Sequence, residues 1–134
     1  MKSYTSAAMT LIALVLSHVA LAADPSDEAL NKLDQNLAVA KSFEHGQDAA
    51  ALMEIEQLVF TLPRESQVRE AIEQKLIDTL QAAATNDAKD FLCRQLRVIA
   101  TVKSIPPLEQ LLTDPQAAHL AVYALGSLEY PEAC

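Results

Sequence analysis

Aromatic residues and glycine are scarce in this chain of 134 residues. It has no tryptophan, three phenylalanines, three tyrosines and two glycines, Gly46 and Gly126. The alternation of apolar and polar residues that marks a half-buried strand is missing, while the good helix formers Ala, Leu, Glu and Gln dominate. These absences argue against a β-rich fold. They predict an all-α protein with tight turns.

The motifs of common catalytic and metal-binding sites are also missing. There is no glycine-rich phosphate loop, Gly-x-Ser-x-Gly elbow, His-Glu-x-x-His sequence or EF-hand loop. The two cysteines do not combine with histidines at a spacing that suits zinc. We expect His45 to lie at a helix end beside Gly46, and His119 to lie on a helix surface or at a contact between helices. The sequence therefore predicts no enzymatic activity, no metal and no cofactor.

The two cysteines, Cys93 and Cys134, lie far apart in the sequence. Cys93 falls inside an apolar helical pattern, and a buried free cysteine behaves as a small hydrophobic residue. That is the preferred interpretation of Cys93. A disulfide between the two cysteines, and a thiol activated by Arg94 and Arg97, are the alternatives.

Residues 1–22 have the three parts of a secretory signal peptide. Lys2 is followed by an apolar run over 7–19, and Ala20 and Ala22 supply the small residues of a cleavage site. The run is too short to span a bilayer. We therefore expect a secreted or periplasmic protein without membrane insertion, whose single domain covers residues 23–134. Cleavage leaves 9 basic and 18 acidic residues, a net charge of −9, which disfavours nucleic acid and anionic lipid as partners.

Apolar spacing predicts six helices. They cover about residues 24 or 26 up to a break at Gly46, then 47–60, 64–83, 87–100, 104–112 and 115–128. We expect Asn86 to cap the fourth helix and Asp114-Pro115 to begin the sixth. The mixed charges on the third helix indicate a solvated face formed by Arg69, Glu70, Glu73, Lys75 and Asp78. The apolar stripes predict a core of Leu30, Leu33, Leu37, Ala40, Leu52, Ile55, Leu58, Val59, Val68, Ala71, Ile72, Leu76, Ile77, Leu80, Phe91, Leu92, Leu96, Ile99, Leu108, Leu111 and Leu112.

The C-terminal third of the chain contains an internal repeat. Residues 91–99 align with 120–128 at an offset of 29, so that Leu92 matches Ala121 and Leu96 matches Leu125. A repeat of this length is typical of stacked helical hairpins, each of which needs a neighbour to bury its apolar face. Arrays of this kind bind or hold other molecules.

The same residues carry a resemblance to a known family. Residues 99–108 with Leu111-Leu112 resemble the turn and outer helix of a HEAT repeat, and residues 114–133 resemble its inner helix and following turn. The short form found in phycobilisome-lyase-type HEAT-like proteins matches best, and residues 88–96 are similar to exported bacterial members. The resemblance is weaker over 24–85. It implies a right-handed α–α superhelix, a HEAT-like solenoid of about three antiparallel hairpins.

The repeat also aligns Cys134 with Ile105, the first apolar residue of an outer helix. A solenoid requires terminal repeats with a polar outer face. The sequence therefore predicts a truncated array, or a fragment of a longer one, with an uncapped C-terminal hairpin. Such a hairpin would favour self-association.

The resemblance implies a secreted protein-interaction or scaffolding module whose second, fourth and sixth helices form a concave binding surface. This otherwise acidic chain has a cluster of basic residues, Lys89, Arg94, Arg97 and Lys103. The cluster is interpreted either as a solvated or inter-repeat pairing face, or as a binding stripe. Arg94 and Tyr123 are equivalent in the repeat, and such residues are enriched in binding hot spots. The candidate partner-binding residues are therefore Arg94, Arg97 and Tyr123, and the partner is a protein of unknown identity. The alternatives are a lyase-like accessory subunit that grips a substrate protein or chromophore, and a remnant of a longer gene.

Overall fold

The computed structural model describes residues 25–128, and every regular element in this range is helical. The elements are α2 (Pro25–Ala40), α3 (Ala50–Thr61), α4 (Gln67–Gln81), α5 (Asn86–Ile99), the 3-10 turn η1 (Val102–Ser104), α6 (Ile105–Leu111) and α7 (Ala118–Leu125). The prediction of an all-α fold is confirmed for this part of the chain. The predicted signal peptide, residues 1–22, and Cys134 lie outside it. None of the described helices is long and apolar enough to cross a membrane.

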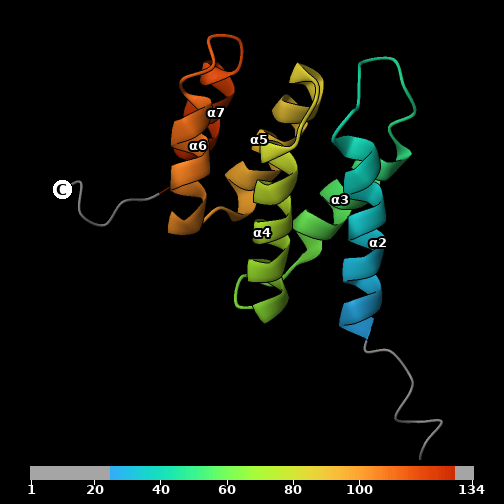
Figure 1. The fold of residues 1–134 in the computed structure, drawn as a ribbon. Coiled ribbons are helices and arrows are strands. Elements are labelled where there is room, and N and C mark those ends of the chain that lie inside the picture. Colours follow the sequence, from blue (N-terminus) through green and yellow to red (C-terminus); the bar gives the residue numbers. More distant parts are fainter. Residues whose placement is uncertain (1–24, 129–134) are drawn as a thin grey trace, which may run out of the picture.

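Consecutive helices pack in pairs. α2 contacts α3, α4 contacts α5, and α6 contacts α7, while further contacts join α2 to α4, α3 to α5 and α5 to α7. Figure 1 shows α2, α4 and α6 in one layer, with α3, α5 and α7 behind them and the two helices of each pair running in opposite directions. Each helix thus buries its apolar stripe against its own partner, and α2, α3, α4, α5 and α7 also pack against a neighbouring pair.

Most of the apolar positions expected in the core are buried. Leu112 is exposed, and the positions that are only partly buried are Leu30, Leu58, Val68, Ala71, Phe91 and Leu111. Leu112 lies one residue beyond the end of α6, where the chain turns away from the helical stripe. Cys93 is fully buried and free, as expected for a small apolar residue. The core is formed by Leu33, Leu37, Ala40, Leu52, Ile55, Val59, Ile72, Leu76, Ile77, Leu80, Leu92, Cys93, Leu96, Ile99, Leu108, Ala117, Leu120 and Ala124.

Burial repeats at the offset of 29 residues. Leu92 and its equivalent Ala121 are both fully buried, whereas Arg94 and Tyr123 are both exposed. The largest departure is at Cys93, which is fully buried while its equivalent Val122 is 61% exposed. Leu96 and Ile99 are also fully buried, whereas their equivalents Leu125 and Leu128 are only partly buried. The sequence repeat therefore corresponds to a repeat in packing, with a difference on α7.

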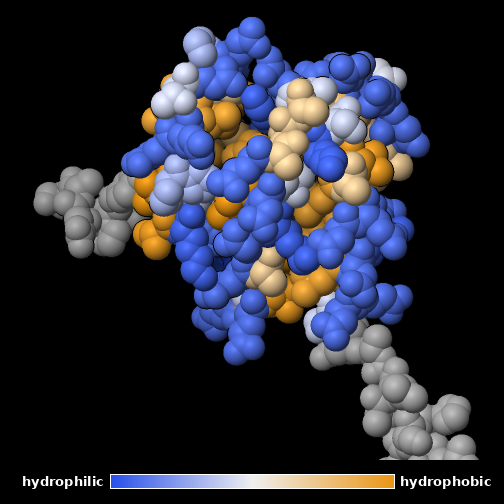
Figure 2. All heavy atoms as spheres, viewed as in Figure 1, coloured by the Kyte–Doolittle hydropathy of each residue, from blue (hydrophilic) through white to orange (hydrophobic). Residues whose placement is uncertain are grey.

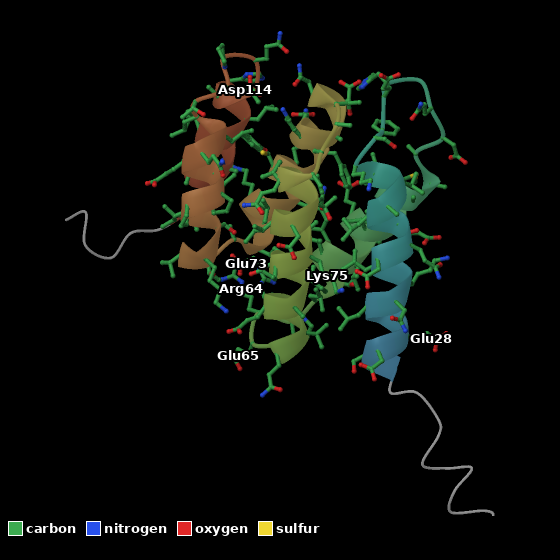
Figure 3. All side chains as sticks on the ribbon, in the orientation of Figure 1. Glu28, Arg64, Glu65, Glu73, Lys75 and Asp114 are labelled. Carbon is green, nitrogen blue, oxygen red and sulfur yellow. The ribbon has the colours of Figure 1, made fainter. Side chains whose placement is uncertain are left out.

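The layer of α2, α4 and α6 presents a polar surface. Figure 2 shows hydrophilic side chains over most of this face, with apolar atoms visible between the helices. Lys75 of α4 reaches toward α2, where its Nζ lies 2.7 Å from Oδ1 of Asp34 (Figure 3). This exposed layer carries the charged face that the sequence predicted for the third helix, with one exception.

That exception is Glu73, whose predicted place on the solvated face is wrong. Glu73 is 1% exposed and accepts hydrogen bonds from the backbone N–H of Thr101 at 2.7 Å and from the Ser104 hydroxyl at 2.7 Å. The Thr101 hydroxyl donates to both carboxylate oxygens at 3.0 Å. Because the turn between α5 and α6 folds over α4, its orphan donors need an acceptor, and Glu73 supplies it.

Two predicted helix starts are also wrong. Thr85, rather than Asn86, caps α5, and its Oγ1 accepts a hydrogen bond from the Ala88 N–H at 3.1 Å. Asp114 accepts from the Gln116 N–H at 3.0 Å, as a capping residue does, but α7 begins only at Ala118. Residues 115–117 form turns before the helix, so Pro115 lies outside it.

Candidate functional site

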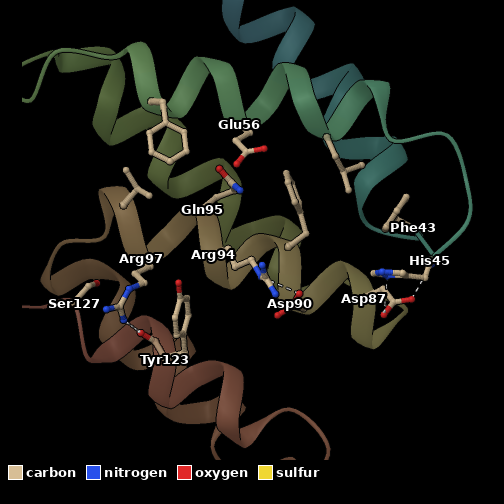
Figure 4. Close-up of a pocket in the computed structure, with 14 residues that line it drawn as sticks. Phe43, His45, Glu56, Asp87, Asp90, Arg94, Gln95, Arg97, Tyr123 and Ser127 are labelled. Carbon is tan, nitrogen blue, oxygen red and sulfur yellow. Dashed lines mark hydrogen bonds and ion pairs between the residues drawn. The ribbon is translucent and has the colours of Figure 1, made fainter.

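A groove of about 750 Å³ runs along α3, α5 and α7, the layer opposite the polar face (Figure 4). Leu52, Glu56 and Phe60 contribute to it from one face of α3, since they are spaced by four residues. The other lining residues are Phe43, His45, Asp87, Asp90, Phe91, Arg94, Gln95, Arg97, Val98, Tyr123 and Ser127. Its size falls within the range of ligand-binding clefts.

Phenylalanine and tyrosine concentrate in this groove. Phe43, Phe60, Phe91 and Tyr123 are all the phenylalanines and tyrosines in residues 25–128, and all four line it. Phe60 is 66% exposed and Tyr123 is 49% exposed. Hollows beside Lys75 and beside Lys89 contain no aromatic side chain. The fold thus leaves its largest apolar side chains at one concave surface instead of placing them all in the core.

The predicted residues Arg97 and Tyr123 lie together at one end of the groove. The guanidinium carbon of Arg97 lies 4.3 Å from the centroid of the Tyr123 ring, a cation–π geometry. The same guanidinium donates a hydrogen bond through Nη1 to the backbone oxygen of Tyr123. Arg97 therefore links α5 to α7 and holds the tyrosine ring at the groove edge (Figure 4).

The third predicted residue, Arg94, also lines the groove, and its charge is paired within α5. Its Nε lies 3.0 Å from Oδ2 of Asp90, one helical turn earlier. Both side chains are well exposed, so this ion pair is weak and can exchange partners. The structure therefore brings all three predicted residues to one surface, and gives each arginine a partner there.

The two lysines of the predicted basic cluster lie elsewhere. Lys89 pairs with Asp114 at 3.0 Å, and Lys103 pairs with Glu70 at 3.2 Å. Neither lysine lines the groove. These two lysines join neighbouring helix pairs, which agrees with the interpretation as a pairing face. Residues 25–128 contain no continuous basic binding stripe.

The groove also holds polar groups without partners. Glu56 has no hydrogen bond or ion pair with any other described residue, and its carboxylate extends from α3 into the groove. Gln95 of α5 is 3% exposed, and its side-chain oxygen is buried without a hydrogen-bond partner. A buried acceptor left unpaired costs free energy. The Gln95 oxygen is therefore an unsatisfied acceptor, and the Glu56 carboxylate lies exposed in the same groove.

The loop between α2 and α3 is fastened to the start of α5. The Ala84 N–H donates to the Lys41 oxygen at 2.8 Å, and the His45 N–H donates to Oδ2 of Asp87 at 2.8 Å. The Thr85 hydroxyl donates to the Phe43 oxygen. The loop turns at Gly46, whose φ of 96° favours glycine. These bonds fix Phe43 at the other end of the groove from Tyr123.

His45 differs from its predicted place at a helix end. α2 already ends at Ala40, so His45 lies in the loop, with Nδ1 at 3.8 Å from Oδ1 of Asp87. Its ring centroid lies 6.5 Å from that of Phe43. His119 is exposed on α7, as predicted for a helix surface.

Cys93 lacks the properties of a reactive thiol. Burial, with a smaller contribution from the negative charge of Asp90, raises the pKa of the Cys93 thiol to about 12. The thiol therefore stays protonated at neutral pH, which disagrees with the activated-thiol alternative. Among residues 25–128, no group of three or more His, Cys, Asp and Glu side chains is placed to hold a metal ion.

Sequence reasoning missed most of the groove. Phe91 was assigned to the core, while Phe43, Phe60, Glu56 and Gln95 received no functional role. The scarcity of aromatic residues was an available signal, since phenylalanines on separate segments of such a chain can converge on one surface. No family model matches this chain, and no curated protein or solved structure matches it either.

Proposed function

We propose that this protein is an exported protein-interaction or scaffolding module, and that its groove receives a segment of a partner protein. The convergence of Phe43, Phe60, Phe91 and Tyr123 on one concave surface carries this proposal. Aromatic and arginine side chains provide much of the binding energy at protein interfaces, because they bury a large area at a small cost in conformational entropy. Arg94, Arg97 and Tyr123 would form one end of the binding surface.

The proposal includes the architecture expected from the resemblance, a right-handed HEAT-like solenoid with the groove on its concave side. Two observations support it. Contacts pass from one helix pair to the next in chain order, and burial at α5 recurs at α7 with the period of the sequence repeat. In such an array the inner helices line a continuous surface, which suits binding of an extended partner.

Replacement of groove residues tests the proposed function. Arg94→Ala and Tyr123→Ala should leave helicity unchanged, because both side chains are exposed. Each should reduce recovery of bound partner from an envelope extract by about tenfold, the effect of removing a hot-spot side chain worth roughly 1.4 kcal/mol. Circular dichroism would check the fold, and quantitative mass spectrometry would measure recovery.

Two matched variants serve as controls. Arg64→Ala removes an exposed arginine outside the groove and should leave recovery unchanged. Tyr123→Phe keeps the ring beneath the Arg97 guanidinium and should retain most of the binding. Equal recovery by wild type, Arg94→Ala and Tyr123→Ala would contradict the proposal, as would equal losses in Arg64→Ala.

A further inference from the structure

The charges that line the groove are not equally satisfied. Both arginines already have partners, Arg94 in Asp90 and Arg97 in the ring and backbone oxygen of Tyr123. Figure 4 shows these pairs within the groove. On the acidic side, Glu56 has no partner among residues 25–128. An entering segment therefore meets paired cations and an available carboxylate.

Gln95 provides a second and independent indication. Its side chain lines the groove from α5, opposite Glu56 on α3, and its oxygen is buried without a hydrogen bond. Figure 4 shows the two side chains extending from their helices into the same part of the groove. Both groups accept hydrogen bonds, so a ligand that satisfies them must bring donors. A carboxylate or phosphate could not do so.

We propose that the occupant of the groove is a basic, amphipathic segment of a partner protein, whose lysine or arginine binds at Glu56 and Gln95. This inference rests on the proposed function and names the chemistry of its partner. The cationic group donates to the Glu56 carboxylate and supplies the bond that Gln95 lacks. Its aliphatic stem and a neighbouring apolar residue pack against Phe60 and Phe91.

The whole molecule favours the same partner. The chain carries 18 acidic and 10 basic residues, so its field attracts a cationic segment and repels an acidic one. This long-range attraction raises the association rate, but it does not determine where on the protein the segment binds. Glu56, Gln95 and the phenylalanines supply the local specificity.

Three fluorescein-labelled peptides of about 14 residues test the proposal on the full chain, by fluorescence anisotropy at about 0.15 M salt. One combines leucine and lysine in an amphipathic helical pattern. The second replaces each lysine with glutamate, and the third replaces each leucine with serine. We expect the leucine–lysine peptide to bind at least about tenfold more tightly than either of the others.

Two charge-matched variants separate groove binding from general attraction. Glu56→Gln should weaken binding of the leucine–lysine peptide about tenfold, the effect of losing a charge-assisted hydrogen bond. Glu54→Gln removes the same charge from the same helix, but Glu54 lies two positions away, where it bonds Asn36 at 2.8 Å and pairs with Lys32 at 3.5 Å. Its effect should stay below about twofold.

The outcomes separate this inference from the proposed function. If the leucine–glutamate peptide binds as tightly as the leucine–lysine peptide and Phe60→Ala weakens both, the basic partner is refuted while a protein-binding groove survives. Equal losses in Glu54→Gln and Glu56→Gln would also refute it, because the attraction would then be general. Failure of all three peptides would refute the inference alone, since recovery of a natural partner tests the proposed function separately.

Discussion

Glu73 shows how a single residue can join distant parts of the chain. It lies on α4, and its carboxylate accepts hydrogen bonds from Thr101 and Ser104, which follow α5. Helical spacing predicted that this glutamate is solvated together with the other charges on its face. The spacing of residues shows which positions share a helix face, but it does not show whether a later segment covers that face. A charged residue inside a charged stripe gives no sign that a loop will fold over it.

Loss of the Glu73 carboxylate should destabilise the fold strongly. Glu73→Ala leaves the Thr101 N–H and the Ser104 hydroxyl buried or half-buried without an acceptor. We expect the free energy of unfolding to fall by about 3 kcal/mol, measured by urea denaturation followed by circular dichroism. Glu70→Ala on the same helix removes only an exposed ion pair with Lys103 and should cost less than about 0.5 kcal/mol. Similar losses in the two variants would contradict the assigned role of Glu73.

Cys93 should resist alkylation in the folded protein. With a pKa of about 12, roughly one thiol in ten thousand is ionised at about pH 8, and the side chain is fully buried. In a Cys134→Ser variant, in which Cys93 is the remaining cysteine, we expect iodoacetamide to label it only after addition of concentrated guanidinium chloride. Rapid labelling under native conditions, detected by intact-mass spectrometry, would argue against this environment.

At the scale of elements, local periodicity predicted the helices well and their ends less well. Apolar residues recur every three or four positions along each helix, so their existence follows from nearby sequence alone. The starts of α5 and α7 depend on turn geometry. Thr85 caps α5 because its hydroxyl also bonds the loop at Phe43, a contact that no local pattern reveals. Asp114 begins a turn that continues for three residues before α7.

Asp114 gives the start of α7 a dependence on pH. A hydrogen bond from Lys89, followed by the backbone N–H of Gln116, lowers the pKa of the Asp114 carboxyl below its ordinary value of 3.8. Because the folded-state pKa lies below the unfolded value, the ionised carboxylate stabilises the fold above the unfolded pKa. That contribution is lost as pH falls through the folded pKa.

Asp114→Asn should therefore lower the urea midpoint at neutral pH, and the gap to wild type should close as the pH falls below 3.8. In a Lys89→Met background the substitution should have a smaller effect, since the charged partner is already missing. Urea titrations at several pH values would measure both results. A gap that widens toward acid would show that the shift has the opposite sign.

At the scale of the whole molecule, the groove could be predicted only in part. The repeat offset identified Arg94 and Tyr123 as equivalent, and both lie on the groove with Arg97. The phenylalanines belong to different segments that the sequence repeat does not relate. Phe43 reaches the groove because its loop is bonded to α5, a tertiary contact between residues more than 40 positions apart.

An exposed valine on α7 is relevant to the self-association expected from the sequence. Val122 is 61% exposed, whereas its equivalent Cys93 is fully buried. We propose that Val122 belongs to a surface through which copies of this chain associate. Val122→Glu should then keep the thermal midpoint within a few degrees, as surface substitutions do, and shift sedimentation toward the monomer. A wild-type protein that sediments as a monomer at high concentration would contradict the proposal.

The most direct test of the account is site-specific photo-crosslinking at Phe60, with Val39 as the comparison. Phe60 lies exposed in the groove, whereas Val39 is exposed on α2 outside it. With a benzoylphenylalanine at position 60, we expect covalent adducts to partner segments that contain lysine or arginine, identified by mass spectrometry of envelope extracts. The same probe at position 39 should give few adducts. Adducts that are equally frequent at both positions, or confined to position 39, would contradict the claim that the groove is the binding surface.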